Sequence, residues 1–247
     1  MSIETEEELK GLLQAGKVVR KAIETMKAHV EPGITTGELD QVGANVFAEF
    51  GARSAPTLAY GFPGTTLISI NDEVVHGIPG NRVLRPGDLV TIDVTVELNG
   101  FIADAAESVV VPPASTLHLK LCECTRTSFE KAIRSARAGR PINAIGKAVE
   151  KEVRSRGFSV IPALSGHGIG RVIHEAPLVP NYEEPSLYQP LTEGLVITIE
   201  PIITSGSGRI YDDKDGWTVK TRDRAPAAHY EHTIVITKDR PILLTAA

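Results

Sequence analysis

Cysteine is scarce in this sequence, and its scarcity excludes one class of protein. The 247 residues contain two cysteines, Cys122 and Cys124. Two thiols do not build the disulfide framework of a small secreted domain. Both fall on a predicted helix two positions apart, so their side chains point in different directions and do not jointly bind a metal. We interpret both as packing residues.

Long apolar runs and an excess of basic charge are also lacking. No apolar run approaches the roughly 20 residues that span a bilayer. The net charge of −5 argues against a nucleic-acid scaffold held by phosphate contacts. Residues 1–8 are mostly acidic and do not follow the basic-then-apolar pattern of a secretory signal. These features favour a cytoplasmic protein without a membrane segment.

What is present is typical of a globular chain. Its apolar content is 42% and its charged content 23%, and 247 residues fit within one large domain. Apolar residues at helical spacing predict helices within residues 5–26, 35–50, 115–136 and 143–156. Capping-box patterns begin the first two, at Thr5 and Thr35. Residues 54–71 predict a loop and strand that either line a pocket or cover the core.

One hairpin carries two acids at positions that look internal. Residues 89–92 form an apolar strand that runs into Asp93. Asn99 and Gly100 predict a tight turn, and the returning strand contains Asp104. A buried charge is costly unless it is paired or bound to a metal, and two neighbouring like charges need a cation even more.

The same arrangement recurs later in the chain. Residues 87–93 align with residues 194–200, so that Glu200, like Asp93, follows a glycine by six positions. A partner strand then supplies Glu231, as the first one supplies Asp104. We therefore predict a single catalytic domain over residues 1–247 with two similar halves, about 1–112 and 113–247. The fold class is α+β, with helices on one face of a mainly antiparallel sheet.

The histidines differ in the patterns around them. Three glycines surround His167 in residues 165–170, which predicts close backbone approach beside it. This segment resembles a phosphate loop, but no lysine or Ser/Thr pattern supports that function. His76 and His174 are further candidates. His232 follows Glu231 and alternates to the other face of its strand. The remaining histidines are interpreted as structural: His29, His118 and His229.

Four carboxylates and one imidazole make a candidate set of metal ligands. Its members are Asp93, Asp104, His167, Glu200 and Glu231. Oxygen-rich ligation with one imidazole suits Mn, Fe, Co or Zn and differs from a thiolate-rich structural zinc site. Two such ions roughly 3.5–4 Å apart hold a bridging water and lower its pKa for attack on a carbonyl. The alternative, that these acids are solvated surface residues, fits Glu73 and Glu183 well. It fits Asp93 and Glu200 poorly, because each closes an apolar strand.

Several short segments together resemble one enzyme family along nearly the whole chain. They are residues 91–93, 103–104, 166–170, 199–201 and 230–233. Their residue types and spacing resemble those of type I methionine aminopeptidases in the short bacterial form. The resemblance implies the pita-bread fold, whose halves are related by a pseudo-twofold axis. That symmetry agrees with the repeat found in the sequence itself.

The resemblance also implies a role for each candidate ligand. Asp93 and Asp104 would hold the more buried of two divalent ions, and His167 and Glu200 would hold the second. Asp104 and Glu231 would bridge the pair. Glu200 would in addition act as general base on the bridging water. The resemblance is compatible with Co, Mn, Fe or Zn.

Residues outside the ligand set are assigned by the same resemblance. His76 would position the scissile amide, and His174 would bind its carbonyl oxygen and stabilise the tetrahedral oxyanion. An apolar pocket for the methionine side chain would be formed by Tyr60, Phe62 and Trp217. Around this pocket the chain departs from the cysteine and aromatic residues often found in the family, which affects the shape of the pocket and leaves the metal set untouched. The departing residues are Ala59, Leu67 and Ile173.

The implied activity is removal of the N-terminal methionine from nascent proteins whose second residue is small. The implied partners are nascent polypeptide N-termini and the ribosome, with a monomeric chain and no membrane or nucleic-acid scaffold. A rival interpretation is an Xaa-Pro aminopeptidase or dipeptidase with the same ligands. Those relatives usually carry an extra N-terminal domain, for which the early first hairpin leaves no room. A metal-free binding module on the same fold predicts lost ligands, yet all five positions are filled.

Overall fold

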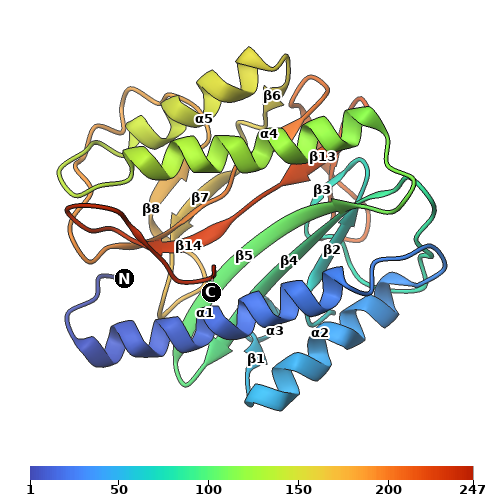
Figure 1. Cartoon of the computed structure of the whole chain (residues 1–247), viewed down its shortest axis with the longest axis horizontal. Coiled ribbons are helices and arrows are strands. Elements are labelled where there is room, and N and C mark those ends of the chain that lie inside the picture. Colours follow the sequence, from blue (N-terminus) through green and yellow to red (C-terminus); the bar gives the residue numbers. More distant parts are fainter. Residues whose placement is uncertain (247) are drawn as a thin grey trace.

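The computed structural model describes residues 1–246 and shows two pairs of helices on either side of a body of strands (Figure 1). None of the helices in this part of the chain combines the length and hydropathy that crossing a membrane requires. The helices are α1 (Glu6–Lys27), α2 (Thr36–Phe50), α3 (Ala55–Tyr60), α4 (Thr116–Ala132), the 3-10 helix η1 (Ile133–Ser135) and α5 (Asn143–Ser155).

Every strand pairing among residues 1–246 is antiparallel, as the sequence predicts. One sheet contains β1, β4, β2 and β5, another has the order β15-β14-β9-β7-β8, and two smaller sheets have three strands each. The strands are β1 (Arg53–Ser54), β2 (Leu67–Ile70), β3 (Glu73–Val75), β4 (Leu89–Leu98), β5 (Phe101–Val110), β6 (Ser159–Val160), β7 (Ser165–Gly168), β8 (Glu175–Pro180), β9 (Val196–Ile199), β10 (Ile202–Thr204), β11 (Ile210–Asp212), β12 (Val219–Thr221), β13 (Ala227–His229), β14 (His232–Val235) and β15 (Ile242–Leu243).

The first core joins helix α1 to the β4–β5 hairpin. Val19 and Ala22 of α1 lie in one buried cluster with Val94 and Val96 of β4 and Ala105 of β5. Each fully buried valine contributes about 1.5–3 kcal/mol relative to an exposed one. This helix therefore fixes the back of the hairpin and leaves its other face free for polar side chains.

The second core repeats this arrangement. Phe129 of α4 and Val149 of α5 are buried with Ile197 and Ile199 of β9 and with Ile234 of β14. In Figure 1, α4 and α5 lie across the strands from α1 and α2. Each helix pair thus covers a pair of strands that leads to two of the predicted acids. The predicted α+β pita-bread arrangement is confirmed.

Short-range capping patterns in the sequence correctly predicted where helix α2 begins and ends. Thr35 and Glu38 form both arms of the predicted capping box, and α2 ends at Gly51 with φ 65°. The pattern at Thr5 makes only one arm, because the carboxylate of Glu8 accepts a hydrogen bond from the backbone N–H of Glu4.

Two boundaries differ from the prediction. The third long helix ends at Ala132 and continues as a 3-10 turn, where a helix through residue 136 was expected. Helix α3 lies in a segment expected to be loop and strand. Ser54 caps it and Pro56 occupies its first turn, where the missing N–H of proline costs no hydrogen bond.

Candidate metal centre

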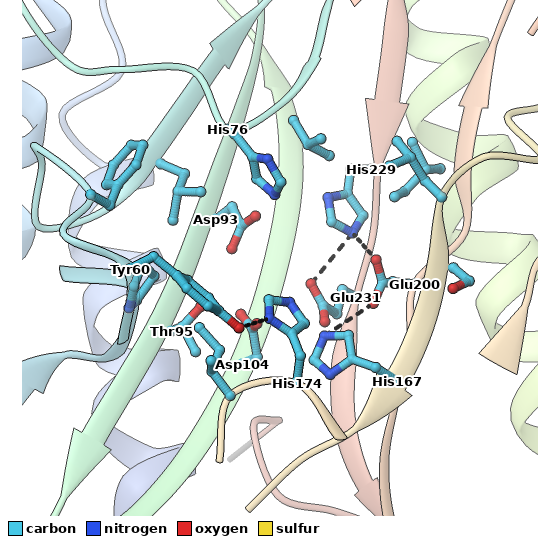
Figure 2. A pocket seen from close by; sticks show the side chains of 18 of the residues that line it. Tyr60, His76, Asp93, Thr95, Asp104, His167, His174, Glu200, His229 and Glu231 are labelled. Carbon is cyan, nitrogen blue, oxygen red and sulfur yellow. Dashed lines mark hydrogen bonds and ion pairs between the residues drawn. The ribbon is translucent and has the colours of Figure 1, made fainter. Parts of the chain in front are cut away.

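Asp93 and Asp104 are neighbours on one face of the β4–β5 hairpin. The register pairs Asp93 with Ala106 and Thr95 with Asp104, so the two acids are diagonal partners. Diagonal partners on one face lie within reach of each other's side chains. Figure 2 shows both carboxyl groups projecting from these strands into a cavity.

Glu200 and Glu231 meet from the second pair of strands. Glu200 directly follows β9 and Glu231 directly precedes β14, where Ile199 pairs with His232. This register places the two glutamates opposite each other. The backbone N–H of Glu231 donates to the carbonyl of Ala106 at 2.9 Å and so joins this second pair of strands to the β4–β5 hairpin. Four carboxylates from the two halves therefore converge.

The glycines around His167 allow neighbouring strands to approach. A Cβ at Gly166 would lie 2.6 Å from the carbonyl oxygen of Thr198, and one at Gly168 would lie 2.2 Å from that of Ala176. Any side chain at either position would collide with backbone. The close approach predicted from the glycines is therefore made by the chain itself, on both sides of strand β7.

His167 presents one free ring nitrogen to the acids. Its Nδ1 lies 2.9 Å from the carbonyl oxygen of Gly168, and because a carbonyl only accepts, Nδ1 carries the proton. Nε2 therefore keeps its lone pair and lies 3.6 Å from Oε1 of Glu200. The hydroxyl of Thr198 accepts from the backbone N–H of His167 and donates to Glu200 at 2.7 Å. Such outer contacts fix the direction of a metal ligand.

Four carboxylates buried together must either hold protons or bind a cation. Burial is the main cause that raises the pKa of each of the four acids, and it brings that of Asp104 to about 7. The charges of the other acids raise the pKa of Asp93 and Glu231 further. Burial also lowers the pKa of His167 to about 4, so its imidazole is neutral at pH 7. Within residues 1–246, no lysine or arginine lines the cavity.

Unpartnered polar atoms show that the donor set fits divalent ions. Among the described residues, Oδ1 of Asp104 and Oε1 of Glu231 are buried without a hydrogen-bond partner. Ligand atoms of Asp104, His167 and Glu231 lie within 4.8 Å of one another. The same holds for a second trio, which consists of Asp93, His229 and Glu231. Carboxylate oxygens combined with imidazole nitrogen are typical ligands of Mn, Fe, Co and Zn. Glu231 belongs to both trios.

The second trio contains a residue that the sequence analysis missed. His229, expected to be structural, joins Asp93 and Glu231 in it. Its side chain is 2% exposed and lines the cavity (Figure 2). Residues alternate between faces along an extended strand, so His229 and Glu231, two positions apart, share a face. The same alternation that excluded His232 from the candidate ligands would therefore have included His229.

His76 and His174 line the same cavity as the acids. His76 has φ 59°, a left-handed conformation that costs a non-glycine residue about 1–2 kcal/mol and is often found at functional sites. Nδ1 of His174 lies 2.7 Å from the hydroxyl of Tyr60, and its ring centroid lies 4.3 Å from that of His167. Burial lowers the pKa of both His76 and His174, so both are neutral at pH 7.

Apolar side chains form the wall of a cavity of about 580 Å³ beside the acids. The three predicted pocket residues all line it: Tyr60, Phe62 and Trp217. The rings of Phe62 and Trp217 meet edge to face at 5.2 Å. Leu67 and Ile173 also line the cavity. Ala59 is exposed on α3 and is not among the residues that line the cavity.

The other residues interpreted as structural lie outside the cavity. Both ring nitrogens of His232 are within hydrogen-bond distance of hydroxyl groups, 2.8 Å from Thr245 and 3.1 Å from Tyr230. His29 and His118 each contact a backbone carbonyl. The two cysteines are free, one of them half-buried and the other buried in the second core.

Comparison with known proteins agrees with this site. The model of metallopeptidase family M24 matches residues 10–238. Methionine aminopeptidase 2 of Bacillus subtilis is 47% identical over 247 residues, which cover 99% of each protein. The crystal structure of a methionine aminopeptidase from Thermotoga maritima superimposes with a TM-score of 0.96 over the full length of both chains, at 34% identity.

A prolidase from Pyrococcus furiosus shares the fold alone. It superimposes with a TM-score of 0.80 at 22% identity, and the match covers 99% of this chain but 65% of the prolidase. The resemblance predicted from the sequence is confirmed by the more similar relatives: the chain belongs to metallopeptidase family M24, among the bacterial methionine aminopeptidases.

Proposed function

We propose that this chain is a metal-dependent aminopeptidase that removes the N-terminal methionine from polypeptides whose second residue is small. The proposal rests on one observation above all. Four carboxylates and His167, supplied by both halves, converge at the buried end of an apolar cavity that has no cationic side chain among its described residues. The relatives that match along the whole chain carry the corresponding name.

Asp93, Asp104, His167, Glu200 and Glu231 are proposed to hold two divalent ions. The chemistry that such a pair supplies when bound is activation of a water molecule at neutral pH. Co, Mn, Fe and Zn all suit these ligands, and their availability in the cell decides among them. Glu200 is the proposed general base. Its carboxylate accepts a hydrogen bond from the hydroxyl of Thr198 at 2.7 Å, which fixes its orientation within the cluster.

His76 and His174 are proposed to handle the scissile amide. When the hydroxyl of Tyr60 donates to Nδ1 of His174, the proton of the imidazole resides on Nε2. That N–H can then donate to a carbonyl oxygen as negative charge develops on it. His76, held on the opposite wall by its left-handed backbone, would position the amide nitrogen (Figure 2).

The apolar wall is proposed to select methionine. Tyr60, Phe62 and Trp217 would enclose its unbranched thioether side chain, and sulfur makes favourable contacts with aromatic rings. The free amine of the substrate would then lie near the second metal. The proposed substrates are nascent chains whose N-termini emerge from the ribosome, cleaved by one monomeric catalytic domain built from the halves about 1–112 and 113–247.

The experiment that tests this function compares Glu200→Gln with the wild-type protein on a Met-Ala-Ser peptide in the presence of Mn²⁺ or Co²⁺. The amide keeps the size of the carboxylate but cannot accept a proton, so turnover should fall by about 10²–10⁴. Glu183→Gln, which removes an exposed carboxylate paired with Lys147, should leave turnover unchanged. Unchanged turnover in Glu200→Gln would exclude the mechanism, and cleavage of Xaa-Pro peptides in place of Met-Ala-Ser would exclude the substrate.

A further inference from the structure

The ring of His229 is buried beside the acids and has no hydrogen-bond partner within the described part of the chain. The residue ends strand β13, where it pairs with Ile202. Its side chain is 2% exposed, and neither Nδ1 nor Nε2 has a partner among residues 1–246. Leaving a buried polar group unsatisfied costs about 1–3 kcal/mol, so such a group calls for an explanation.

A purely structural histidine in the same strand region looks different. His232 is also buried, but both of its ring nitrogens lie within hydrogen-bond distance of hydroxyl groups, at 2.8 and 3.1 Å. It also faces away from the acids. His229 instead turns its Nε2 toward Glu231 and Glu200, as Figure 2 shows. The contrast argues that the ring of His229 is oriented for something other than packing.

The distances match those between ligands of one metal ion. Nε2 of His229 lies 3.3 Å from Oε2 of Glu231, but the orientation of the ring does not make this a hydrogen bond. Ligands about 2.0–2.1 Å from a tetrahedral ion lie about 3.3 Å from each other. A carboxylate oxygen of Asp93 completes a trio whose members all lie within 4.8 Å of one another. The proposed ligands His167 and Glu200 show a similar separation of 3.6 Å.

We propose that Nε2 of His229 is a sixth protein ligand of the metal centre, bound to the ion held by Asp93 and Glu231. This inference rests on the metal centre of the proposed function and adds a ligand to it. Each of the two ions then has one imidazole, from His229 and from His167. Imidazole suits Zn, Fe and Co, whereas Mn is better matched by oxygen ligands, so His229 should shift the preference of this ion away from Mn.

Co²⁺ added to the metal-free full-length protein provides the test. Unpaired electrons of Co²⁺ shift the proton resonances of its ligands far outside the ordinary range. With two equivalents of Co²⁺, the wild-type protein should show two shifted, solvent-exchangeable imidazole N–H resonances. His229→Gln should show one, whereas the control His232→Gln, which changes another buried histidine on the other face, should retain two.

Metal affinity provides a second readout. Loss of even an outer partner of a ligand weakens binding about 10–100-fold, so His229→Gln should weaken Co²⁺ binding at least about tenfold and Mn²⁺ binding less. A single shifted imidazole resonance in the wild-type protein would overturn the proposal, even if the variant failed to fold. Equal Co²⁺ affinities of folded His229→Gln and wild-type protein would do the same. Cleavage of Met-Ala-Ser by the wild-type protein is measured in a separate assay. Loss of that cleavage would contradict the proposed function, whereas the resonances and affinities test only the role of His229 as a ligand.

Discussion

Metal binding by this protein should release protons, because its acids hold protons when no ion is bound. Burial raises the pKa of Asp104 to about 7 and also raises those of its three neighbours. A group with that pKa is about nine-tenths protonated at pH 6 and about one-tenth protonated at pH 8. Asp104 alone should therefore release about 0.9 proton at pH 6. His167, whose pKa is lowered to about 4, is neutral at pH 6 and should release none.

The same proton makes metal affinity depend on pH. An ion that must displace the proton of Asp104 binds about tenfold more tightly at pH 8 than at pH 6, which corresponds to ~1.4 kcal/mol. The other acids add to this figure. Calorimetric titration of the metal-free protein with Co²⁺, in two buffers of different protonation enthalpy at each pH, measures both the proton number and the affinity.

The free energy of unfolding of the metal-free protein should also depend on pH, because Asp104 has different pKa values in the folded and unfolded states. The folded-state pKa of Asp104 lies above its ordinary value of 3.8, so the stability that this carboxyl contributes is fully present below about pH 3.8. It is lost as the pH rises through about 7. Co²⁺ should therefore raise the melting temperature more at pH 7.5 than at pH 5.

A matched control tests whether the released protons come from the metal-site acids or from any buried carboxyl group. Glu73 also has a pKa raised by burial, but it is paired with Arg82 and Lys220 outside the cluster. Glu73→Gln should leave the number of released protons unchanged, whereas Asp104→Asn should reduce it. Binding without proton release at pH 6, together with an affinity that does not change up to pH 8, would refute this reasoning.

Three further substitutions test the support of the site. Gly166→Ala should destabilise the fold by about 1–3 kcal/mol in denaturant titration, because its Cβ would lie 2.6 Å from the carbonyl oxygen of Thr198. Thr198→Val removes the hydroxyl that joins two proposed ligands, so Co²⁺ affinity should fall about 10–100-fold by calorimetry. Tyr60→Phe removes the 2.7 Å hydrogen bond to His174, and kcat/KM on Met-Ala-Ser should fall about three- to tenfold.

Two of these substitutions have a matched control. Gly80→Ala, where a Cβ meets nothing within 4 Å, should change stability by less than about 0.5 kcal/mol, and an equal loss at both glycines would contradict the steric argument. Thr237→Val removes an exposed hydroxyl and should leave Co²⁺ affinity unchanged. Full activity of Tyr60→Phe would show that the hydroxyl does not orient the imidazole of His174.

The sequence predicted those features that depend on local pattern or on the internal repeat. The β4–β5 hairpin formed as expected, because the turn at Asn99 and Gly100 and the apolar alternation specify its register. Strands β9 and β14 pair as well, but β10 to β13 lie between them in the chain, so the second hairpin predicted from the repeat is a pairing of distant strands. Since Asp93 and Glu200 occupy equivalent places in the repeat, convergence of their strands followed from the symmetry. The capping box at Thr35 likewise depends on residues three positions apart.

What the sequence did not predict depends on contacts between distant segments. His229 was assigned by a general expectation for lone histidines, although alternation along the strand would have placed it on the face of Glu231. That Asp93 lies beside both of them follows from the fold. Ala59 was expected near the pocket, but helix α3 turns it to solvent. The glycines around His167 correctly predicted close approach, yet the approaching groups are the carbonyls of Thr198 and Ala176.

The central claim is that side chains from both halves of the chain hold one pair of ions. Anomalous diffraction at the cobalt absorption edge, from crystals of the protein loaded with Co²⁺, measures this directly. We expect two peaks roughly 3.5–4 Å apart, both within bonding distance of Glu231 and each within bonding distance of one imidazole nitrogen. Absence of density between Asp93, Asp104, Glu200 and Glu231, or cobalt bound only elsewhere on the surface, would contradict the claim.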